Sequence, residues 1–261
     1  MKKKAQAPML IEERRQHILS LIQKRGRVLV DELSEDLNLS KITIRKDLDH
    51  LQAKDLLVRT HGGALPAQAG ALSDPTIQEK EELHHEEKVR IAKGAAAMVS
   101  EGQCIILDSG TTTTEIAHAL GSIRHLTIIT NALNIAADLA QSDFEIILIG
   151  GTLRKNSLSV VGPLAEDVLK EIHADIVFLG VDGFDAKVGL TTPNVLEARV
   201  NRAMVKAAEK VVAVCDSSKF NRRSLSLIVG ASAIDHVITD NALPLEEVKA
   251  IRDAGIEITV V

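Results

Sequence analysis

The sequence predicts an α/β protein with a small helical unit at its N-terminus and a larger unit built on a parallel sheet. Beyond residue 100, seven short and almost continuously apolar runs alternate with helical stretches, which is typical of parallel strands covered on both faces. The first 52 residues instead repeat apolar side chains at helical spacing. Residues 64–75 (ALPAQAGALSDP) have the small, flexible composition of a linker. We therefore predict domains at 1–63 and 76–261, joined by the linker 64–75.

Three helices are predicted in the N-terminal domain, and their spacing is that of a helix-turn-helix. The third is the most distinctive, because Ser40 can cap its first turn and Ile44 and Leu48 share one face. The apolar run that follows ends in two glycines, as expected of a wing hairpin. A short apolar segment before the second helix could pair with that wing. The predicted elements are helices Ile11–Lys24, Asp31–Leu37 and Ser40–His50, the segment Val28–Val30 and the wing Leu56–Gly63.

Charge is distributed unevenly between the two domains. Residues 1–62 carry 13 Lys and Arg against 9 Asp and Glu, a balance of +4, whereas the rest carries 18 against 27, a balance of −9. This difference favours contact of the N-terminal domain alone with a polyanion. Lys41, Arg45 and Lys46 lie off the apolar face of the third helix, which suits insertion into a DNA major groove. The alternative is an amphipathic surface helix with solvated charges.

The composition argues against several other classes of protein. Four Phe and no Trp or Tyr leave little for stacking on single-stranded nucleic acid. The apolar runs are too short to span a bilayer, and no signal-peptide core follows the basic start. Cys104 and Cys215 fit reduced core thiols, and His84 and His85 lack a third donor for a metal. We therefore expect a cytoplasmic protein without a metal or a cofactor.

Polar residues and glycines follow five of the predicted strands directly. The carboxyl ends of parallel strands meet at one edge of the sheet, where ligands bind, although turns favour the same residue types. The loop Ser109–Thr113 has the features of a phosphate site: Gly110 allows close approach, and a helix expected at Thr114–Leu120 directs its first N–H groups outward. The alternative is an ordinary Ser/Thr-capped turn. The predicted strands are Cys104–Asp108, Leu126–Asn131, Glu145–Gly150, Asp175–Gly180, Lys210–Asp216, His236–Thr239 and Ile256–Val260.

The N-terminal domain resembles the DeoR family of bacterial transcriptional repressors. Arg14, Ile18 and Ile22 stand at four-residue steps, and the run Ser40–Leu48 matches the family's third helix in register. The resemblance implies that this helix binds double-stranded operator DNA, that Arg59 lies in the wing, and that Asp47 has a structural role. The expected DNA-binding residues are Ser40, Lys41, Thr43, Arg45, Lys46, Arg59 and His61.

The C-terminal domain resembles the sensor domain of the same family in the order of its motifs. These motifs are Asp108–Thr114, Thr130–Asn131, Gly150–Gly151, Gly180–Gly183, Glu197–Ala198 and Asp216–Phe220. The family's domain is similar to sugar-phosphate isomerases and CoA transferases, and its usual effector is a phosphorylated sugar or a related metabolite. The expected effector-binding residues are Asp108, Ser109, Gly110, Thr111, Thr112, Thr113, Asn131, Gly150, Gly151, Asp182, Glu197 and Lys219.

Two functions are compatible with these features. The first is a repressor of a carbohydrate-utilisation operon that binds DNA as a homo-oligomer, a dimer or tetramer, because paired heads read repeated half-sites. The second is an isomerase-type enzyme in which Asp182, Glu197 and Lys219 supply an acid, a base and a phosphate partner. An enzyme has no need of a winged helix-turn-helix, and similarity of fold does not carry activity with it. We therefore predict the repressor and expect no catalytic residue.

Overall fold

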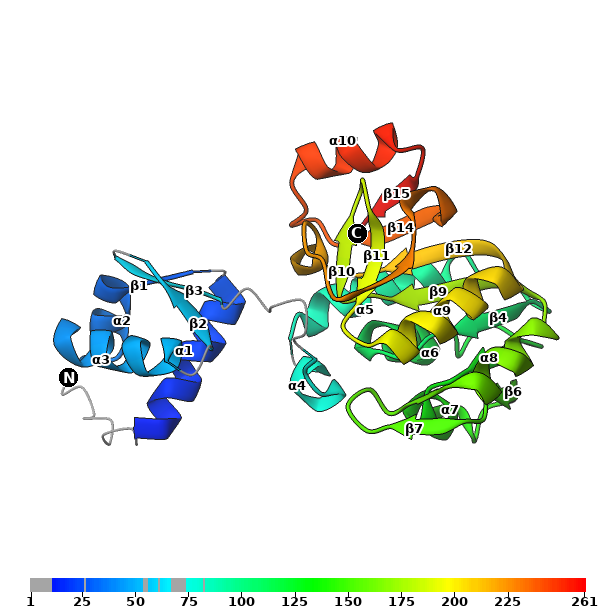
Figure 1. Cartoon of the computed structure of the whole chain (residues 1–261), viewed down its shortest axis with the longest axis horizontal. Helices are drawn as coiled ribbons and strands as arrows, with labels where there is room; N and C mark the ends of the chain where they lie inside the picture. Colours follow the sequence, from blue (N-terminus) through cyan, green and yellow to red (C-terminus); the bar gives the residue numbers. More distant parts are fainter. Residues whose placement is uncertain (1–10, 26, 54–55, 61, 67–73, 82) are drawn as a thin grey trace. The chain divides into compact units, whose positions relative to one another are not determined.

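The computed structural model describes residues 11–25, 27–53, 56–60, 62–66, 74–81 and 83–261. The chain divides into two compact units, Met1–Gly70 and Ala71–Val261, and each is described by itself (Figure 1). We call them the head and the body.

The head is a three-helix unit with a small antiparallel sheet. Its helices bury one apolar cluster that includes Ile18, Leu33, Ile44 and Leu48, as the helical spacing predicts. The central strand of the sheet pairs with the segment before the second helix, as predicted for the wing. This strand, Gly63–Pro66, continues past Gly63, so the wing includes three residues that were predicted as linker. The elements are α1 (Ile11–Arg25), β1 (Val28–Leu29), α2 (Val30–Asp36), α3 (Lys41–Gln52), β2 (Leu57–Arg59) and β3 (Gly63–Pro66), with strand order β1-β3-β2.

Two side chains fix the third helix of the head. Ser40 caps α3, because its hydroxyl accepts from the backbone N–H of Thr43 at 3.1 Å. Asp47 is buried, and its carboxylate is bound by Arg14 Nε at 2.6 Å and Arg15 Nε at 3.1 Å. The expected structural role of Asp47 is therefore to hold α3 against α1.

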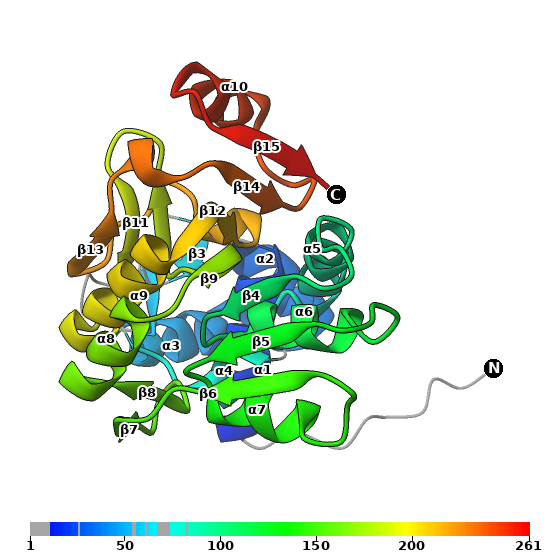
Figure 2. The same cartoon turned by 90° about the vertical axis from the view of Figure 1, so that its right-hand side faces the viewer.

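The body is built on a seven-stranded parallel sheet, and the predicted α/β class is confirmed. All seven predicted strands are present in the order β15-β14-β12-β9-β4-β5-β6 (Figure 2). Their burial follows their apolar runs, since most residues of β4, β5, β9 and β12 are inaccessible to solvent. The strands are β4 (Cys104–Leu107), β5 (Thr127–Thr130), β6 (Glu145–Leu148), β9 (Ala174–Gly180), β12 (Ala208–Val214), β14 (His236–Thr239) and β15 (Glu257–Val260).

Helices cover both faces of this sheet and form two separate hydrophobic clusters with it. The helices α5 to α7 contribute to one cluster, and α8 to α10 contribute to the other. Their bounds are α5 (His85–Ala96), α6 (Thr111–Ala119), α7 (Leu133–Leu139), α8 (Pro163–Lys170), α9 (Val195–Ala207) and α10 (Leu245–Asp253).

Several body elements differ from the sequence prediction. The stretch Thr76–Ser100, charged in its first half and rich in alanine in its second, predicts one helix, but α4 (Ile77–Glu81) ends before His84. The φ of His84, 55°, lies in the left-handed region and separates α4 from α5. The helix expected from Thr114 begins at Thr111 instead. Two antiparallel groups were not predicted, because their strands are short and end in turns. They are β7 (Thr152–Arg154) with β8 (Ser159–Val161), and β10 (Gly183–Asp185), β11 (Gly189–Thr192) and β13 (Ser226–Val229).

Candidate DNA-binding surface and effector site

The outer side of α3 carries the basic residues that the sequence singled out. Lys41, Arg45 and Lys46 are exposed, whereas Ile44 and Leu48 on the other side are fully buried. Arg59 on β2 lies beside the helix, since its Nη1 donates to the carbonyl of Arg45 at 3.4 Å. This arrangement gives α3 and the wing one shared cationic surface.

The remaining predicted DNA-binding residues lie at the start of α3 or outside the described ranges. The hydroxyls of Ser40 and Thr43 are 2.9 Å apart, and Ser40 also serves as the helix cap. Lys41 is paired with Asp31 at 2.9 Å on an exposed surface, which costs little to exchange for a phosphate. His61 lies outside the described residues.

At the carboxyl edge of the body sheet, Asp108 is the most deeply buried of the predicted effector residues with a charge. Asn201 Nδ2 donates to Asp108 Oδ2 at 3.0 Å, while Asp108 Oδ1 has no hydrogen-bond partner among the described residues. Burial, followed by the nearby carboxylates of Glu197 and Asp182, raises the pKa of Asp108 well above its usual value. Asp108 is therefore a buried carboxyl with one oxygen that can accept a further hydrogen bond.

Asp182 and Glu197 meet at Thr192, and a cation neutralises each of them. The Thr192 hydroxyl lies 3.3 Å from Asp182 Oδ2 and 3.2 Å from Glu197 Oε2. Lys80 Nζ binds Asp182 at 2.7 Å, and Arg154 Nη1 binds Glu197 at 3.0 Å. Although burial opposes the change, Lys80 and Lys219 lower the pKa of Asp182, so this carboxyl is charged at neutral pH.

A second set of charged residues, Asp216 and Lys219, follows β12. Lys219 lies in the turn that Asp216 caps, because Asp216 Oδ1 accepts from the N–H of Ser218 at 3.0 Å. Lys88 on α5 is buried, and its ammonium donates to the carbonyl of Lys80. Burial lowers the pKa of Lys88 to about 8, opposed by the charge of Asp216. The edge therefore holds cations contributed by three separate segments of the chain.

The loop Ser109–Thr113 passes close to β9. A Cβ on Gly180 would lie 3.1 Å from the carbonyl oxygen of Ser109, so glycine permits this approach. Gly110 has a φ of 143°, and α6 starts at the next residue. The hydroxyls of Thr113 and Thr114 donate to the carbonyl of Gly110 at 2.9 and 2.8 Å. The free donors of this loop are therefore its first backbone N–H groups and not the hydroxyl of Thr113.

Asn131 and Gly151 both lie against β8. Asn131 is buried, its Nδ2 donates to the carbonyl of Val160 at 3.3 Å, and its Oδ1 has no partner among the described residues. Gly151, at a φ of 147°, lies against β8, since a Cβ there would meet the carbonyl of Val161 at 2.8 Å. Gly150 is exposed and has open space beside its Cα.

Five residues of this site were not predicted. Lys80 and Lys88 belong to the charged first half of the stretch Thr76–Ser100, whose composition predicts a solvated helix and gives no sign that Lys88 is buried. Arg154 stands three residues after the glycine pair, and this proximity in sequence was its one available signal of a place in the site. The residues are Lys80, Lys88, Arg154, Thr192 and Asn201.

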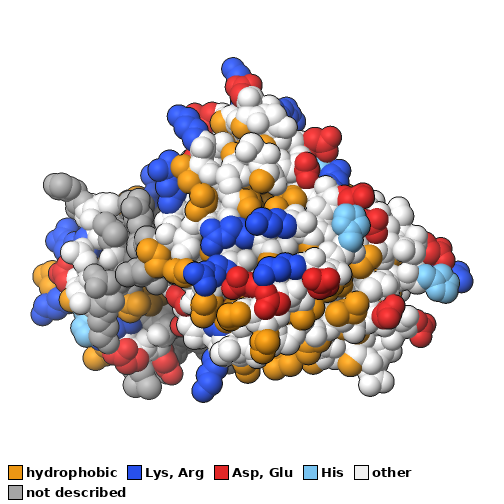
Figure 3. Space-filling model, turned by 45° about the vertical axis from the view of Figure 1, so that its right-hand side comes forward, with side chains coloured by type: hydrophobic (Ala, Val, Ile, Leu, Met, Phe, Trp, Pro, Cys, Tyr) orange, Lys and Arg blue, Asp and Glu red, His pale blue; other side chains and the backbone are white. Residues whose placement is uncertain are grey.

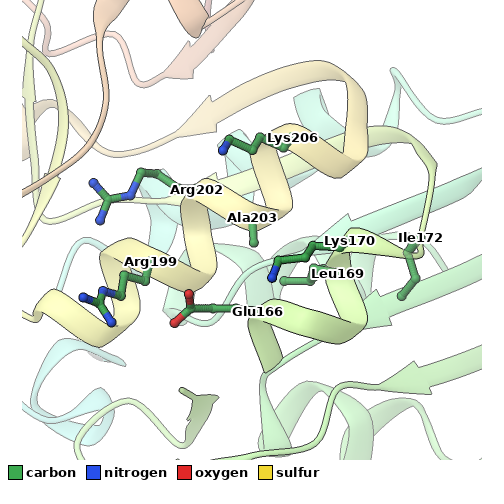
Figure 4. A pocket seen from close by; sticks show the side chains of 8 residues that line it. All are labelled: Glu166, Leu169, Lys170, Ile172, Arg199, Arg202, Ala203 and Lys206. Atoms are coloured by element: carbon green, nitrogen blue, oxygen red, sulfur yellow. The ribbon is translucent and has the colours of Figure 1, made fainter. Parts of the chain in front are cut away.

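A hollow of about 380 Å³ lies elsewhere on the body, between α8 and α9 (Figure 4). None of the predicted effector residues lines it. Its walls combine an apolar floor with a mostly basic rim: Glu166, Leu169, Lys170, Ile172, Arg199, Arg202, Ala203 and Lys206.

A winged helix-turn-helix with a cationic outer face, followed by an α/β unit with charged residues at its carboxyl edge, defines a two-domain transcription regulator. The model of the DeoR-like helix-turn-helix domain matches residues 14–68, and that of the DeoR C terminal sensor domain matches residues 83–241. The chain belongs to the DeoR family of transcriptional regulators. Among the described residues, no helix is long and apolar enough to cross a membrane.

Curated relatives match along nearly the full chain. A protein of Escherichia coli O157:H7, whose name provisionally assigns it as the aga operon transcriptional repressor, is 39% identical over 95% of this chain and 93% of its own. The HTH-type transcriptional regulator GlpR of Haloferax volcanii is 38% identical over 96% of this chain and 98% of its own. The glycerol-3-phosphate regulon repressor of Escherichia coli K12 is 34% identical over 94% of this chain and 97% of its own.

Solved structures resemble the chain only distantly. Ribose 5-phosphate isomerase A from Methanocaldococcus jannaschii is similar with a TM-score of 0.40 and 19% identity, over 52% of this chain and 55% of that one. This is a likeness of fold, at an identity that does not carry activity.

Proposed function

We propose that the protein represses a carbohydrate-utilisation operon and that a phosphorylated sugar or a related metabolite relieves the repression. The observation that carries this proposal is the meeting of Asp108, Asp182 and Glu197 with Lys80 and Arg154 at one edge of the body sheet. Asp108 Oδ1 and Asn131 Oδ1 are buried and have no hydrogen-bond partner among the described residues. Each could accept a hydrogen bond from a hydroxyl group of a polyol. The name of the glycerol-3-phosphate regulon repressor supports an effector of this chemistry.

The proposed DNA contacts are those of α3 and the wing. Arg45 would read a base in the major groove, since a guanidinium can bind guanine bidentately. Lys41, Lys46 and Arg59 would contact phosphates, and such contacts position the head without reading sequence. The first turn of α3, with Ser40 and Thr43, would approach the backbone of the duplex.

In the proposed effector site, the phosphoryl group binds the first N–H groups of α6, after Gly110. The positive end of the helix and the cation Lys219 favour an anion there. Hydroxyl groups of the effector would donate to Asp182, Glu197 or Asn131. Because Asp182 and Glu197 are already paired with Lys80 and Arg154, the effector must rearrange these pairs or add to them.

The proposed active species is a homo-oligomer with an even number of heads, because two heads on repeated half-sites gain effective concentration. The alternative of an isomerase-type enzyme is disfavoured, since the sequence relatives are named as transcription regulators. Detectable turnover of aldose or ketose phosphates by the purified protein would revive it.

The effector site is tested by Thr112→Glu, which places a carboxylate at the start of α6. The cognate sugar phosphate should raise the melting temperature of the wild type and weaken its operator binding, and the unphosphorylated sugar should do so far less. The variant should bind the operator normally and fail to respond. Thr112→Ser is the matched control and should respond. A Thr112→Glu protein that responds like the wild type would exclude phosphate binding at this loop.

A further inference from the structure

Exposed hydrophobic side chains surround β6, the strand at one edge of the body sheet. Ile147 and Leu148 on this strand expose 37% and 43% of their surface. The neighbouring segments add further apolar side chains, since α7 contacts β6 and β7 follows β6 after three residues. Hydrophobic side chains gather along the lower part of the body in Figure 3. We call the following residues the β6 surface: Leu133, Ile147, Leu148 and Leu153.

This sheet edge lacks the usual protection against pairing. Among the described strands, β6 pairs with β5 alone. Native proteins guard an open edge with lysine, proline, a bulge or a covering loop, because its free N–H and C=O groups recruit other strands. Residues 146–153 (IILIGGTL) contain no charge and no proline, and the single charge on β6 is Glu145 at its start. Such an edge indicates a surface that is covered in the working protein.

The backbone of β6 shows which groups are available to a partner. The N–H group of Glu145 donates to the carbonyl of Leu126, just before β5, at 3.0 Å, and that of Ile149 donates to the carbonyl of Thr130 on β5 at 2.9 Å. Because the bonding direction alternates along a strand, Ile147 also faces β5, and the N–H and C=O groups of Ile146 and Leu148 face away from it. Two consecutive outward positions are what an added antiparallel strand requires.

We propose that β6 of a second copy covers this edge, in antiparallel pairing centred on Ile147, so that the two body sheets join across a two-fold axis. In this register Ile146 of each copy opposes Leu148 of the other, and the outward backbone groups of both strands are satisfied. An antiparallel pair of identical strands is self-complementary, as a two-fold interface must be. The inference rests on the proposed homo-oligomeric repressor and assigns its interface.

Charge and composition favour a second copy over other occupants. Antiparallel pairing places the two Glu145 carboxylates at opposite ends of the interface, whereas parallel pairing would place like charges side by side. The apolar side chains of the β6 surface match the composition of homodimer interfaces, which are more apolar than other protein surfaces.

The register is tested by disulfide cross-linking of the full-length protein. Ile147→Cys should form a covalent dimer on mild oxidation, because opposed residues of a non-hydrogen-bonded antiparallel pair have Cα atoms about 4.5 Å apart, within reach of a disulfide. Glu145→Cys is the matched control on the same strand and face. It opposes Ile149 of the other copy and should remain unlinked. The wild type, with Cys104 and Cys215, gives the background.

The surface is tested by sedimentation of Ile147→Lys, which should weaken self-association at least tenfold and leave the circular dichroism spectrum unchanged. Leu245→Lys is the matched control, because Leu245 is 86% exposed on α10, outside the β6 surface. A wild type that is monomeric at micromolar concentration would refute the homo-oligomer of the proposed function. A wild-type oligomer that Ile147→Lys leaves intact, or that Ile147→Cys fails to cross-link, would overturn this interface alone.

Discussion

The cations on the outer side of α3 in the head and those at the carboxyl edge of the body sheet differ in exposure. Lys41, Arg45 and Lys46 on α3 are exposed. In the body, Lys80 and Arg154 are held by buried or half-buried carboxylates, and Lys88 is itself buried. An exposed cation keeps its charge available to a polyanion, whereas an internally neutralised one contributes to a site for a small ligand. Under the proposed function, DNA would bind a preformed surface, whereas the effector would rearrange an existing network of ion pairs or add to it.

The two regions also differ in how far apart in the sequence their polar partners lie. The ion pair between Arg14 and Asp47 in the head spans 33 residues. In the body, the pair of Lys80 with Asp182 spans 102 residues, and Asn201 with Asp108 spans 93. The body site therefore exists only when the whole sheet is formed. The predictions below test this contrast, starting with the largest effect.

Asp47→Ala should have the largest effect, because it removes the carboxylate that Arg14 binds and leaves the largely buried Arg15 with Glu12 alone among the described residues. Arg14 and Arg15 expose only 12% and 17% of their side chains. Loss of the shared carboxylate should destabilise the head by about 3 kcal/mol. Hydrogen exchange of α1 and α3 measures the loss within the full chain. Asp49→Ala, whose side chain is 66% exposed beside Arg59, should change stability by less than about 1 kcal/mol. Equal effects in both variants would contradict the structural role of Asp47.

Arg45→Ala tests whether the exposed head cations include a base contact. It should weaken operator binding by about 1–3 kcal/mol and relax specificity at a single base position. Competition between operators substituted at one position each, at fixed salt, measures both effects. Loss of affinity that is uniform across all operators would exclude Arg45 from base recognition.

Lys88→Met tests the buried cation of the body through pH. The pKa of Lys88 is lowered by burial from 10.5 to about 8. Between these values the unfolded chain binds a proton that the folded protein does not, so the stability of the wild type should rise with pH, by about 1 kcal/mol per unit. Urea unfolding at pH 8 and pH 9.5 measures this rise in the free energy of unfolding. The variant should lack the share of the rise that comes from Lys88. An identical pH dependence in both proteins would show that Lys88 is charged when folded.

Lys46→Ala should have the smallest effect. As a phosphate contact, it should weaken binding to all DNA sequences alike and reduce the slope of log affinity against log salt by about one unit. Fluorescence anisotropy over a salt series measures the slope. An unchanged slope would place Lys46 outside the interface with DNA.

The head could be predicted almost completely because its signals are local. The cap at Ser40 acts on a residue three positions away, and the apolar face of α3 repeats within a few residues. The pairing of β1 with the wing follows from two short apolar segments in one small domain. Each feature needs little information from distant parts of the chain.

In the body, the sequence predicted the strands and most of their carboxyl-edge residues but not the partners that they meet. Lys80 and Lys88 stand in a highly charged stretch, and charged stretches are usually solvated. The ion pair of Lys80 and the burial of Lys88 depend on the break at His84, which separates α4 from α5. A left-handed histidine has no clear signal in its neighbours, so the break in the helix was missed.

The sequence by itself determined the elements whose burial repeats along the chain: the head helices, the seven parallel strands, and the placement of Asp108, Asn131 and Asp182 at strand ends. Tertiary structure alone decided which charges meet, because pairs such as Arg154 with Glu197 form only after β7, β8 and α9 pack together. It also decided that β6 is an edge. An interior and an edge strand of a parallel sheet have similar apolar sequences, and the order of strands is set by crossover connections, which no local periodicity records.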